Sequence, residues 1–279
     1  MTEPEVRREE AWSFTVTPPP AYESEPEPES FDDEPEDEPS VDLWNTVGHE
    51  RPWATVLLLF TWCAIFAAMG LAHDLGSAQG DFAWGALSMA RDGWSQPWRW
   101  LAYTGVHANV VHLFSNALSM VVLGAAVERI FTRAHLAIVF VGGGVVGAWG
   151  TLVWHAYRHG GTPGVTLGAS GAVFALGGAL LSAAWRLRHR LAPSRARALA
   201  ASILWLVVPG MAIGFSKPEV GSAAHVAGFA SGLGLGLVLG MDPRLGVRPV
   251  TRVSRAVGWV SAATLVACYV AGVVSGLRS

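Results

Sequence analysis

The sequence predicts an all-α membrane protein, a polytopic bundle of seven transmembrane helices. Residues 51–279 contain seven apolar stretches, each close to the roughly 20 residues that a helix needs to cross the hydrocarbon core of a bilayer. Glycine is frequent inside several of them, as in VGGGVVGAWG. Glycine weakens helices in water, but in a membrane small residues let neighbouring helices approach closely.

The predicted spans are helices because lipid offers no hydrogen-bond partner to an exposed backbone. They cover approximately residues 53–72, 108–127, 134–154, 168–186, 198–214, 222–240 and 256–276. With the N-terminus in the cytoplasm, twelve arginines flank the inner ends of the spans, against five basic residues at the outer ends. Because basic residues favour the cytoplasmic side, we expect a multi-pass plasma-membrane protein with a cytoplasmic N-terminus and its C-terminus outside.

Residues 1–50 differ sharply from the remainder of the chain. They hold sixteen of the twenty-two acidic residues and include the run ESEPEPESFDDEPEDEP. Such a composition buries too little apolar surface to offset the entropy of ordering. We expect residues 1–50 to be a disordered cytoplasmic tail, whose partner, if it has one, the sequence does not identify. Residues 51–279 are the expected membrane domain.

The sequence gives no sign of a cofactor, a metal or a nucleic-acid partner. The two cysteines, Cys63 and Cys268, lie inside predicted spans, where we expect them to pack as small apolar residues rather than to form a disulfide or a metal site. No C-x-x-C pair and no glycine-rich phosphate loop ending in lysine occurs. The arginine-rich segment 186–197 is explained by the membrane topology.

Four polar residues lie at similar depths in three of the predicted spans. Polar groups at membrane depth are costly and mark functional sites. At a rise of 1.5 Å per residue, Ser170, His225 and His112 lie about 3, 5 and 6 Å below the starts of their spans, and Asn116 lies about 12 Å below. All three spans begin at the expected outer face. The sequence therefore predicts a polar site near that face.

The spacing of small residues predicts which helices meet at this site. His112 and Asn116 are four residues apart and share a helix face. His225 is followed by a glycine stripe on one face of the sixth span, and the fourth span carries a matching stripe. The two stripes are Gly228, Gly232 and Gly236, and Gly171, Ala175 and Ala179. If these faces pack together, His225 comes close to Ser170.

Such a pair has a definite chemistry. A serine hydroxyl becomes a good nucleophile when a histidine removes its proton. Candidate donors to the oxyanion are the side chains of His112 and Asn116 and the backbone N–H groups of Ser170 and Gly171. The spans contain no acidic residue except Glu128, at an inner end. The residues therefore favour a Ser170–His225 dyad over a triad.

The same motifs resemble the rhomboid family of intramembrane serine proteases. The resemblance runs from about Trp98 to Gly236 and is carried by PWRWLAYTGVHANVVHLFSN, LGAAVE, GASG and AAHVAGFASGLGLG. It implies a six-helix core over about 53–240, with 256–276 as an extra helix, and a water-filled cavity open to the outer face. It implies Ser170 as nucleophile and His225 as base, without a cofactor. The residues that it implies as supporting are His107, Gly168, Phe174, Gly228 and Gly232.

The resemblance also implies a substrate class, namely single-span membrane proteins cut in or near a transmembrane segment that unwinds locally. Three positions depart from the family pattern: Phe174 stands where tyrosine is frequent, Thr132 where glycine is frequent, and Ser222 where asparagine is common. None of them removes a reacting group. The first outer loop, 73–104, carries four tryptophans, and either it lies half in the outer leaflet or these form an ordinary aromatic belt.

Two other functions compete with this interpretation. One is a catalytically silent rhomboid-like protein that binds membrane clients, which the loss of Ser170 or His225 would favour. The other is a membrane hydrolase whose metal is held by His107, His112 and His225, since neutral imidazole suits zinc. Against the metal hypothesis, no acidic residue accompanies these histidines, and Ser170 would have no role.

Overall fold

The computed structural model describes residues 42–48, 51–160, 164–216 and 222–279, and every structural statement below refers to these residues. The predicted all-α membrane fold is confirmed. Within the described residues, six helices are long and apolar enough to cross a membrane, and α9 (Ser222–Val238) is a shorter apolar helix of 17 residues. The six are α2 (Trp53–Leu71), α5 (Val110–Ile130), α6 (Arg133–His159), α7 (Ser170–Leu187), α8 (Pro193–Ser216) and α10 (Arg252–Gly276).

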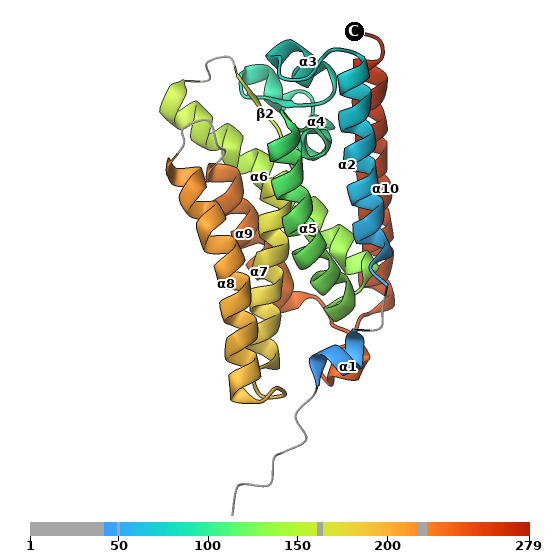
Figure 1. Cartoon of the computed structure of the whole chain (residues 1–279), viewed down its shortest axis with the longest axis vertical. Coiled ribbons are helices and arrows are strands. Elements are labelled where there is room, and N and C mark those ends of the chain that lie inside the picture. Colours follow the sequence, from blue (N-terminus) through green and yellow to red (C-terminus); the bar gives the residue numbers. More distant parts are fainter. Residues whose placement is uncertain (1–41, 49–50, 161–163, 217–221) are drawn as a thin grey trace, which may run out of the picture. The chain divides into compact units, whose positions relative to one another are not determined.

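Helix α7 lies at the centre of the bundle. Of an 18-residue window in this helix, 78% is buried, against 11% in α8 and 22% in α2. It packs against α5, α6, α8 and α9, while α2 and α10 lie on the far side of α5 and α6 (Figure 1). The helix that begins at Ser170 is therefore the most enclosed of the spans.

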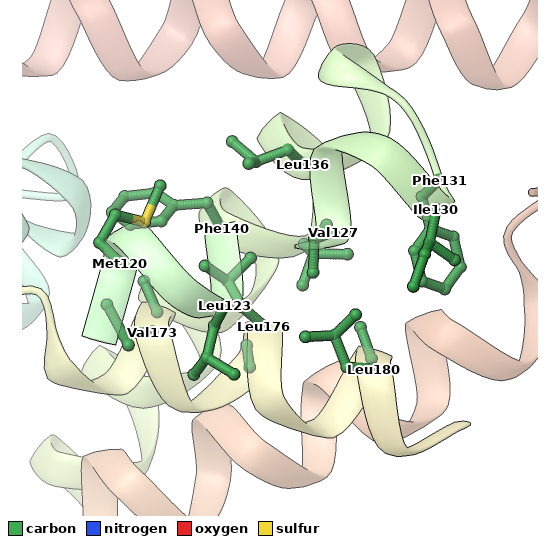
Figure 2. Close-up of a cluster of buried hydrophobic side chains, with 14 of the residues drawn as sticks. Met120, Leu123, Val127, Ile130, Phe131, Leu136, Phe140, Val173, Leu176 and Leu180 are labelled. Atoms are coloured by element: carbon green, nitrogen blue, oxygen red, sulfur yellow. The ribbon is translucent and has the colours of Figure 1, made fainter. Parts of the chain in front are cut away.

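Large apolar side chains fill the space between α5, α6 and α7. Figure 2 shows Met120, Leu123 and Val127 of α5 facing residues of the other two helices, and all three are almost fully buried. Their labelled neighbours are Leu136 and Phe140 of α6 and Val173, Leu176 and Leu180 of α7. Since lipid is as apolar as leucine, close van der Waals packing rather than escape from water holds such helices together.

Glycines bring α9 into backbone contact with α7, as the sequence predicted. A β-carbon built on Gly228 would lie against the carbonyl oxygen of Gly171 and 2.8 Å from its carbonyl carbon. One built on Gly232 would lie against the backbone of Ala175, and one on Gly236 would be 2.7 Å from the Cα of Ala179. The predicted pairing of the two stripes is confirmed.

The buried carboxylate of Glu128 caps the start of α2. Its oxygens accept hydrogen bonds from the backbone N–H groups of Ala54 and Thr55 and from the Thr55 hydroxyl, each at 3.0 Å. Arg133 lies 3.3 Å from the same carboxylate. The first N–H groups of a helix lack partners within the helix. This carboxylate therefore ties the end of α5 to the beginning of α2.

The segment between α2 and α5 is more ordered than the predicted loop 73–104. It contains α3 (Ala78–Ala83), β1 (Leu87–Ser88), the 3-10 helix η1 (Arg91–Trp94), α4 (Arg99–Ala102) and the 3-10 helix η2 (Tyr103–Gly105). Strand β1 pairs in an antiparallel sense with β2 (Val165–Thr166), which precedes α7. The buried Arg99 guanidinium donates to the carbonyl oxygens of Phe82 and Ala86. This arginine holds the segment together from inside.

Tryptophans in this segment have different surroundings. Trp84 is buried, and a β-carbon built on Gly276 of α10 would lie directly against its ring. Trp94 is 44% exposed. Trp84 therefore packs under α10, whereas Trp94 lies on the surface, and the position of the loop relative to the outer leaflet stays a prediction.

The two cysteines and the predicted tail differ in part from what the sequence predicted. Cys63 is exposed on α2, so it does not pack inside the bundle, whereas Cys268 is half-buried.

The short helix α1 (Leu43–Val47) lies within the range predicted as tail, with Leu43 and Val47 buried and Asp42 3.7 Å from Arg195. Residues 1–41 and 49–50 of the predicted tail lie outside the described residues.

Candidate active site

Ser170 is the first residue of α7, and the loop before it has a conformation that requires glycine. Gly168 has a φ of +108°, a region that residues with a β-carbon rarely adopt. A β-carbon there would also lie 2.5 Å from the imidazole of His112. The Gly168 N–H donates to the carbonyl oxygen of Tyr103 at 2.9 Å. Gly168 therefore fixes the approach to Ser170 and makes room for the His112 ring.

His225 lies near the start of α9 and faces Ser170. Its Nε2 is 2.8 Å from the Ser170 Oγ, within hydrogen-bond range. The imidazole is buried, 5% exposed, and packs on the ring of Phe174, with centroids 4.4 Å apart and planes inclined by 31°. A β-carbon on Gly210 of α8 would meet the Phe174 ring at 2.8 Å. Phenylalanine thus supplies a packing surface for His225 without a hydroxyl.

The other ring nitrogen of His225, Nδ1, is buried and has no hydrogen-bond partner among the described residues. An acidic third member would be expected to accept a hydrogen bond from this atom. Glu219, the acidic residue nearest to His225 in sequence, lies outside the described residues. The described geometry is that of a pair, and its catalytic role stays a prediction.

His112, near the start of α5, lies beside the Ser170 loop, and Asn116 and His107 are its neighbours. The His112 ring contacts Gly168, two residues before Ser170. Asn116 is buried one turn further along α5, and its Nδ2 donates to the His112 carbonyl oxygen at 3.0 Å. His107 is fully buried, with its ring centroid 5.2 Å from that of His112. His112 and Asn116 are thus one turn apart on α5, as their spacing suggested, and His107 packs against His112.

Tyr103 is a part of the site that sequence reasoning missed. It is buried, and its hydroxyl donates to the Gly144 carbonyl oxygen on α6 at 3.0 Å. A β-carbon on Gly171 would be 3.4 Å from this hydroxyl. The Tyr103 carbonyl also receives the Gly168 N–H. Tyr103 thus supports both the loop and the first turn of α7. Its hydrogen bonds to the Gly144 carbonyl and from the Gly168 N–H involve backbone groups, which every residue has, so the sequence gives no sign of them.

A second group of buried side chains, which the sequence analysis did not identify, connects α10 to the site. The Tyr269 hydroxyl lies 2.8 Å from Thr104 Oγ1 and accepts a hydrogen bond from the Trp62 indole N–H at 3.2 Å. The Trp62 and His107 ring centroids are 5.5 Å apart, and His107 in turn lies against His112. A continuous series of buried side chains therefore runs from α10 through α2 to the histidines.

The described residues give no support to the metal hypothesis. Among them, no three His, Cys, Asp or Glu side chains are grouped so that they could hold a metal ion. His107 and His112 are neighbours, but the Nε2 of His225 points at the Ser170 hydroxyl instead. The three histidines thus do not converge on one point.

Comparison with known proteins decides the family. The sequence profile of the Rhomboid domain matches residues 94–242, just over half of the chain. The chain belongs to the rhomboid family. The matched range contains Ser170, His225 and the residues around His112, but it excludes Trp62 of α2 and Tyr269 of α10.

Relatives with this domain come from a plant and a bacterium. RHOMBOID-like protein 1 of Arabidopsis thaliana is 30% identical over 149 residues, which are 53% of this chain and 36% of that protein. Rhomboid protease GluP of Bacillus subtilis is 25% identical over 196 residues, 70% of this chain and 36% of that protein. The putative rhomboid protease YdcA of the same bacterium is 27% identical over 146 residues, 52% of this chain and 67% of that protein.

The matches to RHOMBOID-like protein 1, GluP and RHOMBOID-like protein 5 of Arabidopsis thaliana span about a third to a half of those proteins. Two of the relatives described above are named as proteases. The relationship supports intramembrane proteolysis at the level of the family.

Proposed function

We propose that this rhomboid is an intramembrane serine endopeptidase in which Ser170 is the nucleophile and His225 the general base. The observation that carries the proposal is the 2.8 Å separation between Ser170 Oγ and His225 Nε2 in a buried setting. A base must lie within about 2.6–3.2 Å of the proton's donor atom. Membership of a family with named proteases supports the same reaction.

In the first half of the proposed reaction, His225 Nε2 removes the hydroxyl proton as Ser170 Oγ attacks the peptide carbonyl carbon. The developing oxyanion needs donors that are already in place. The N–H groups of Ser170 and Gly171 belong to the first turn of α7, where backbone donors have no partner within the helix. His112, held against Gly168, and Asn116 are the proposed side-chain donors.

In the second half, protonated His225 gives its proton to the leaving amine, the C–N bond breaks, and the acyl group stays on Ser170. A water molecule then loses a proton to the same Nε2 and attacks the ester. Collapse of the second tetrahedral intermediate releases the carboxylic acid and returns the proton to Ser170. The cycle consumes one water molecule and needs no cofactor.

The proposed substrates are single-span membrane proteins. A peptide bond inside a transmembrane helix is hydrogen-bonded and shielded, so the segment must unwind locally before Ser170 can attack it. We place the active-site opening on the outer side of the plasma membrane, because the arginine distribution favours a cytoplasmic N-terminus. The cut segment would therefore lie near the outer surface.

A serine-reactive fluorophosphonate tests the proposal on detergent-purified protein. The parent protein should be labelled, Ser170→Ala should not be, and His225→Ala should be labelled far more slowly because the base is lost. Ser202→Ala and His189→Ala are matched controls, since Ser202 bonds only within its own exposed helix face and His189 is exposed. Both controls should be labelled at the parent rate.

Cleavage of a single-span substrate in the same detergent completes the test. Activity in the parent and its loss in both Ser170→Ala and His225→Ala would support the dyad. Full cleavage by Ser170→Ala would remove Ser170 from the chemistry. A well-folded parent that neither reacts with the probe nor cleaves any single-span substrate would instead indicate a silent, client-binding rhomboid.

A further inference from the structure

An apolar groove runs along the outside of the bundle between α2 and α10, with α6 as its floor. Its volume is about 830 Å³, and the two helices that form its walls lie side by side in Figure 1. On α2 the groove extends from Trp53 to Ala68, which corresponds to about 22 Å at 1.5 Å per residue. One leaflet of the hydrocarbon core is about 15 Å thick, so an acyl chain lying along the groove has room for its full length.

A polar pocket of about 280 Å³ lies beside one end of this groove. The two spaces share Arg133 and Trp259 in their linings, so they are direct neighbours. The pocket is lined by four arginines and two carboxylates, which leaves two positive charges in excess. These residues are Arg51, Arg129, Arg133, Arg255, Glu128 and Asp242.

Both carboxylates of the pocket already have partners in the fold. Glu128 accepts three hydrogen bonds from the start of α2 and lies 3.3 Å from Arg133. Asp242 makes two side-chain hydrogen bonds with Arg244, at 2.9 Å each, and these hold the pKa of Asp242 below its usual value. Arg244 does not line the pocket. Arg51 and Arg255 are exposed on its rim.

Tryptophans mark the junction between the apolar groove and the charged pocket. Trp53 and Trp259 line the groove at that end and are 54% and 58% exposed. Exposed tryptophan prefers the level of the lipid headgroups. A ligand that fills both spaces must therefore have an apolar part in the groove and an anionic group in the arginine pocket, at the level of the lipid headgroups.

We propose that the α2–α10 groove and its arginine pocket bind one anionic phospholipid, with the phosphate among the arginines and an acyl chain along the groove. Arginine suits phosphate because its planar guanidinium donates two parallel hydrogen bonds. Basic pockets between transmembrane helices bind anionic headgroups for the same reason. The groove lining includes Tyr269 of α10, whose hydroxyl contacts Thr104 and Trp62, so a bound lipid lies against the helix that reaches the histidines.

Native mass spectrometry of delipidated, detergent-purified protein tests the proposal. Dioleoyl phosphatidylglycerol should bind with one tight site, and dioleoyl phosphatidylcholine, with the same chains, should bind at least tenfold more weakly. The double variant Arg51→Gln/Arg255→Gln should lose on the order of tenfold in affinity for the anionic lipid. Arg197→Gln/Arg278→Gln removes the same charge from exposed positions elsewhere and should bind like the parent.

A second variant examines the groove separately from the charges. Ala262→Trp places a large side chain between the walls and should displace the lipid, whereas Ala201→Trp, on the exposed face of α8, should not. Equal binding of the two lipids, or unchanged binding in both the arginine and the groove variants, would overturn the proposal. So would inorganic phosphate that competes as well as the intact lipid, since the pocket would then be an anion site without a lipid. None of these readouts depends on protease activity.

Discussion

Replacing Gly228 with alanine should separate the two helices that carry Ser170 and His225. The new β-carbon would lie 2.8 Å from the carbonyl carbon of Gly171, whereas ordinary contact begins at 3.4 Å. The helices must therefore move apart by at least about 0.6 Å, and by more because the carbonyl oxygen is closer still. Gly171 is next to Ser170, and Gly228 is one turn from His225. The 2.8 Å hydrogen bond between them would stretch to the limit of its range.

Two measurements follow from this displacement. Inserting volume into a packed interior costs about 1–3 kcal/mol, so the thermal unfolding midpoint in detergent should fall by several degrees. A misplacement on the order of 1 Å costs up to about 100-fold in rate. The rate of fluorophosphonate labelling at Ser170 should therefore drop by about 10- to 100-fold, more than the loss of folded protein accounts for.

Gly234 provides the matched control on the same helix. A β-carbon there meets nothing within 4 Å, so Gly234→Ala should keep the parent rate and the parent midpoint. If Gly228→Ala also keeps both, the backbone contact between α7 and α9 does not set the position of His225. If Gly234→Ala loses as much as Gly228→Ala, any added methyl on α9 is harmful and the argument from close approach fails.

Three further predictions concern single residues. Asn116→Ala should lower kcat about 100- to 1,000-fold through the loss of one oxyanion donor, with KM unchanged and slow inhibitor labelling retained; full turnover would make Asn116 structural. Gly168→Ala should cost about 1–3 kcal/mol of stability because of its φ of +108° and should slow labelling by displacing His112; parent-like unfolding and labelling would refute this. Burial raises the pKa of Asp81 from 3.8 to about 6, so the folded chain holds this proton more tightly than the unfolded chain. The resulting stability is present below pH 3.8 and is lost as the pH rises through about 6; thermal unfolding of Asp81→Asn, compared with the parent, should lack this pH dependence, and identical pH profiles would contradict the assignment.

The arrangement of the spans and the central pair of residues could be predicted because both leave periodic signals. A stripe of glycines every four residues marks a face that touches another backbone, and Gly228 does contact Gly171. Polar residues in apolar segments stand out against a uniform background, as Ser170 and His225 do. Such signals need only one helix at a time to be recognised.

What escaped prediction depends on partners far apart in the chain. Tyr103 acts through the carbonyl of Gly144, and every residue has a carbonyl. The capping of α2 by Glu128 joins positions 73 and 74 residues apart. The pairing of β1 with β2 involves two residues on each strand, too few for an alternating pattern to appear. In each case the deciding contact is set by tertiary packing and has no local signature.

The Tyr269 hydroxyl has a consequence for the order in which the molecule is completed. Chains are synthesised from the N-terminus, so α10 enters the membrane after every other described helix. Until it does, the buried indole N–H of Trp62 lacks the acceptor that Tyr269 provides, and an unpaired buried donor costs about 1–3 kcal/mol. Because Trp62 lies against His107 and His107 against His112, the histidine side of the site acquires this support only when α10 is in place. We therefore expect a nascent chain halted before residue 252 to lack the proposed activity.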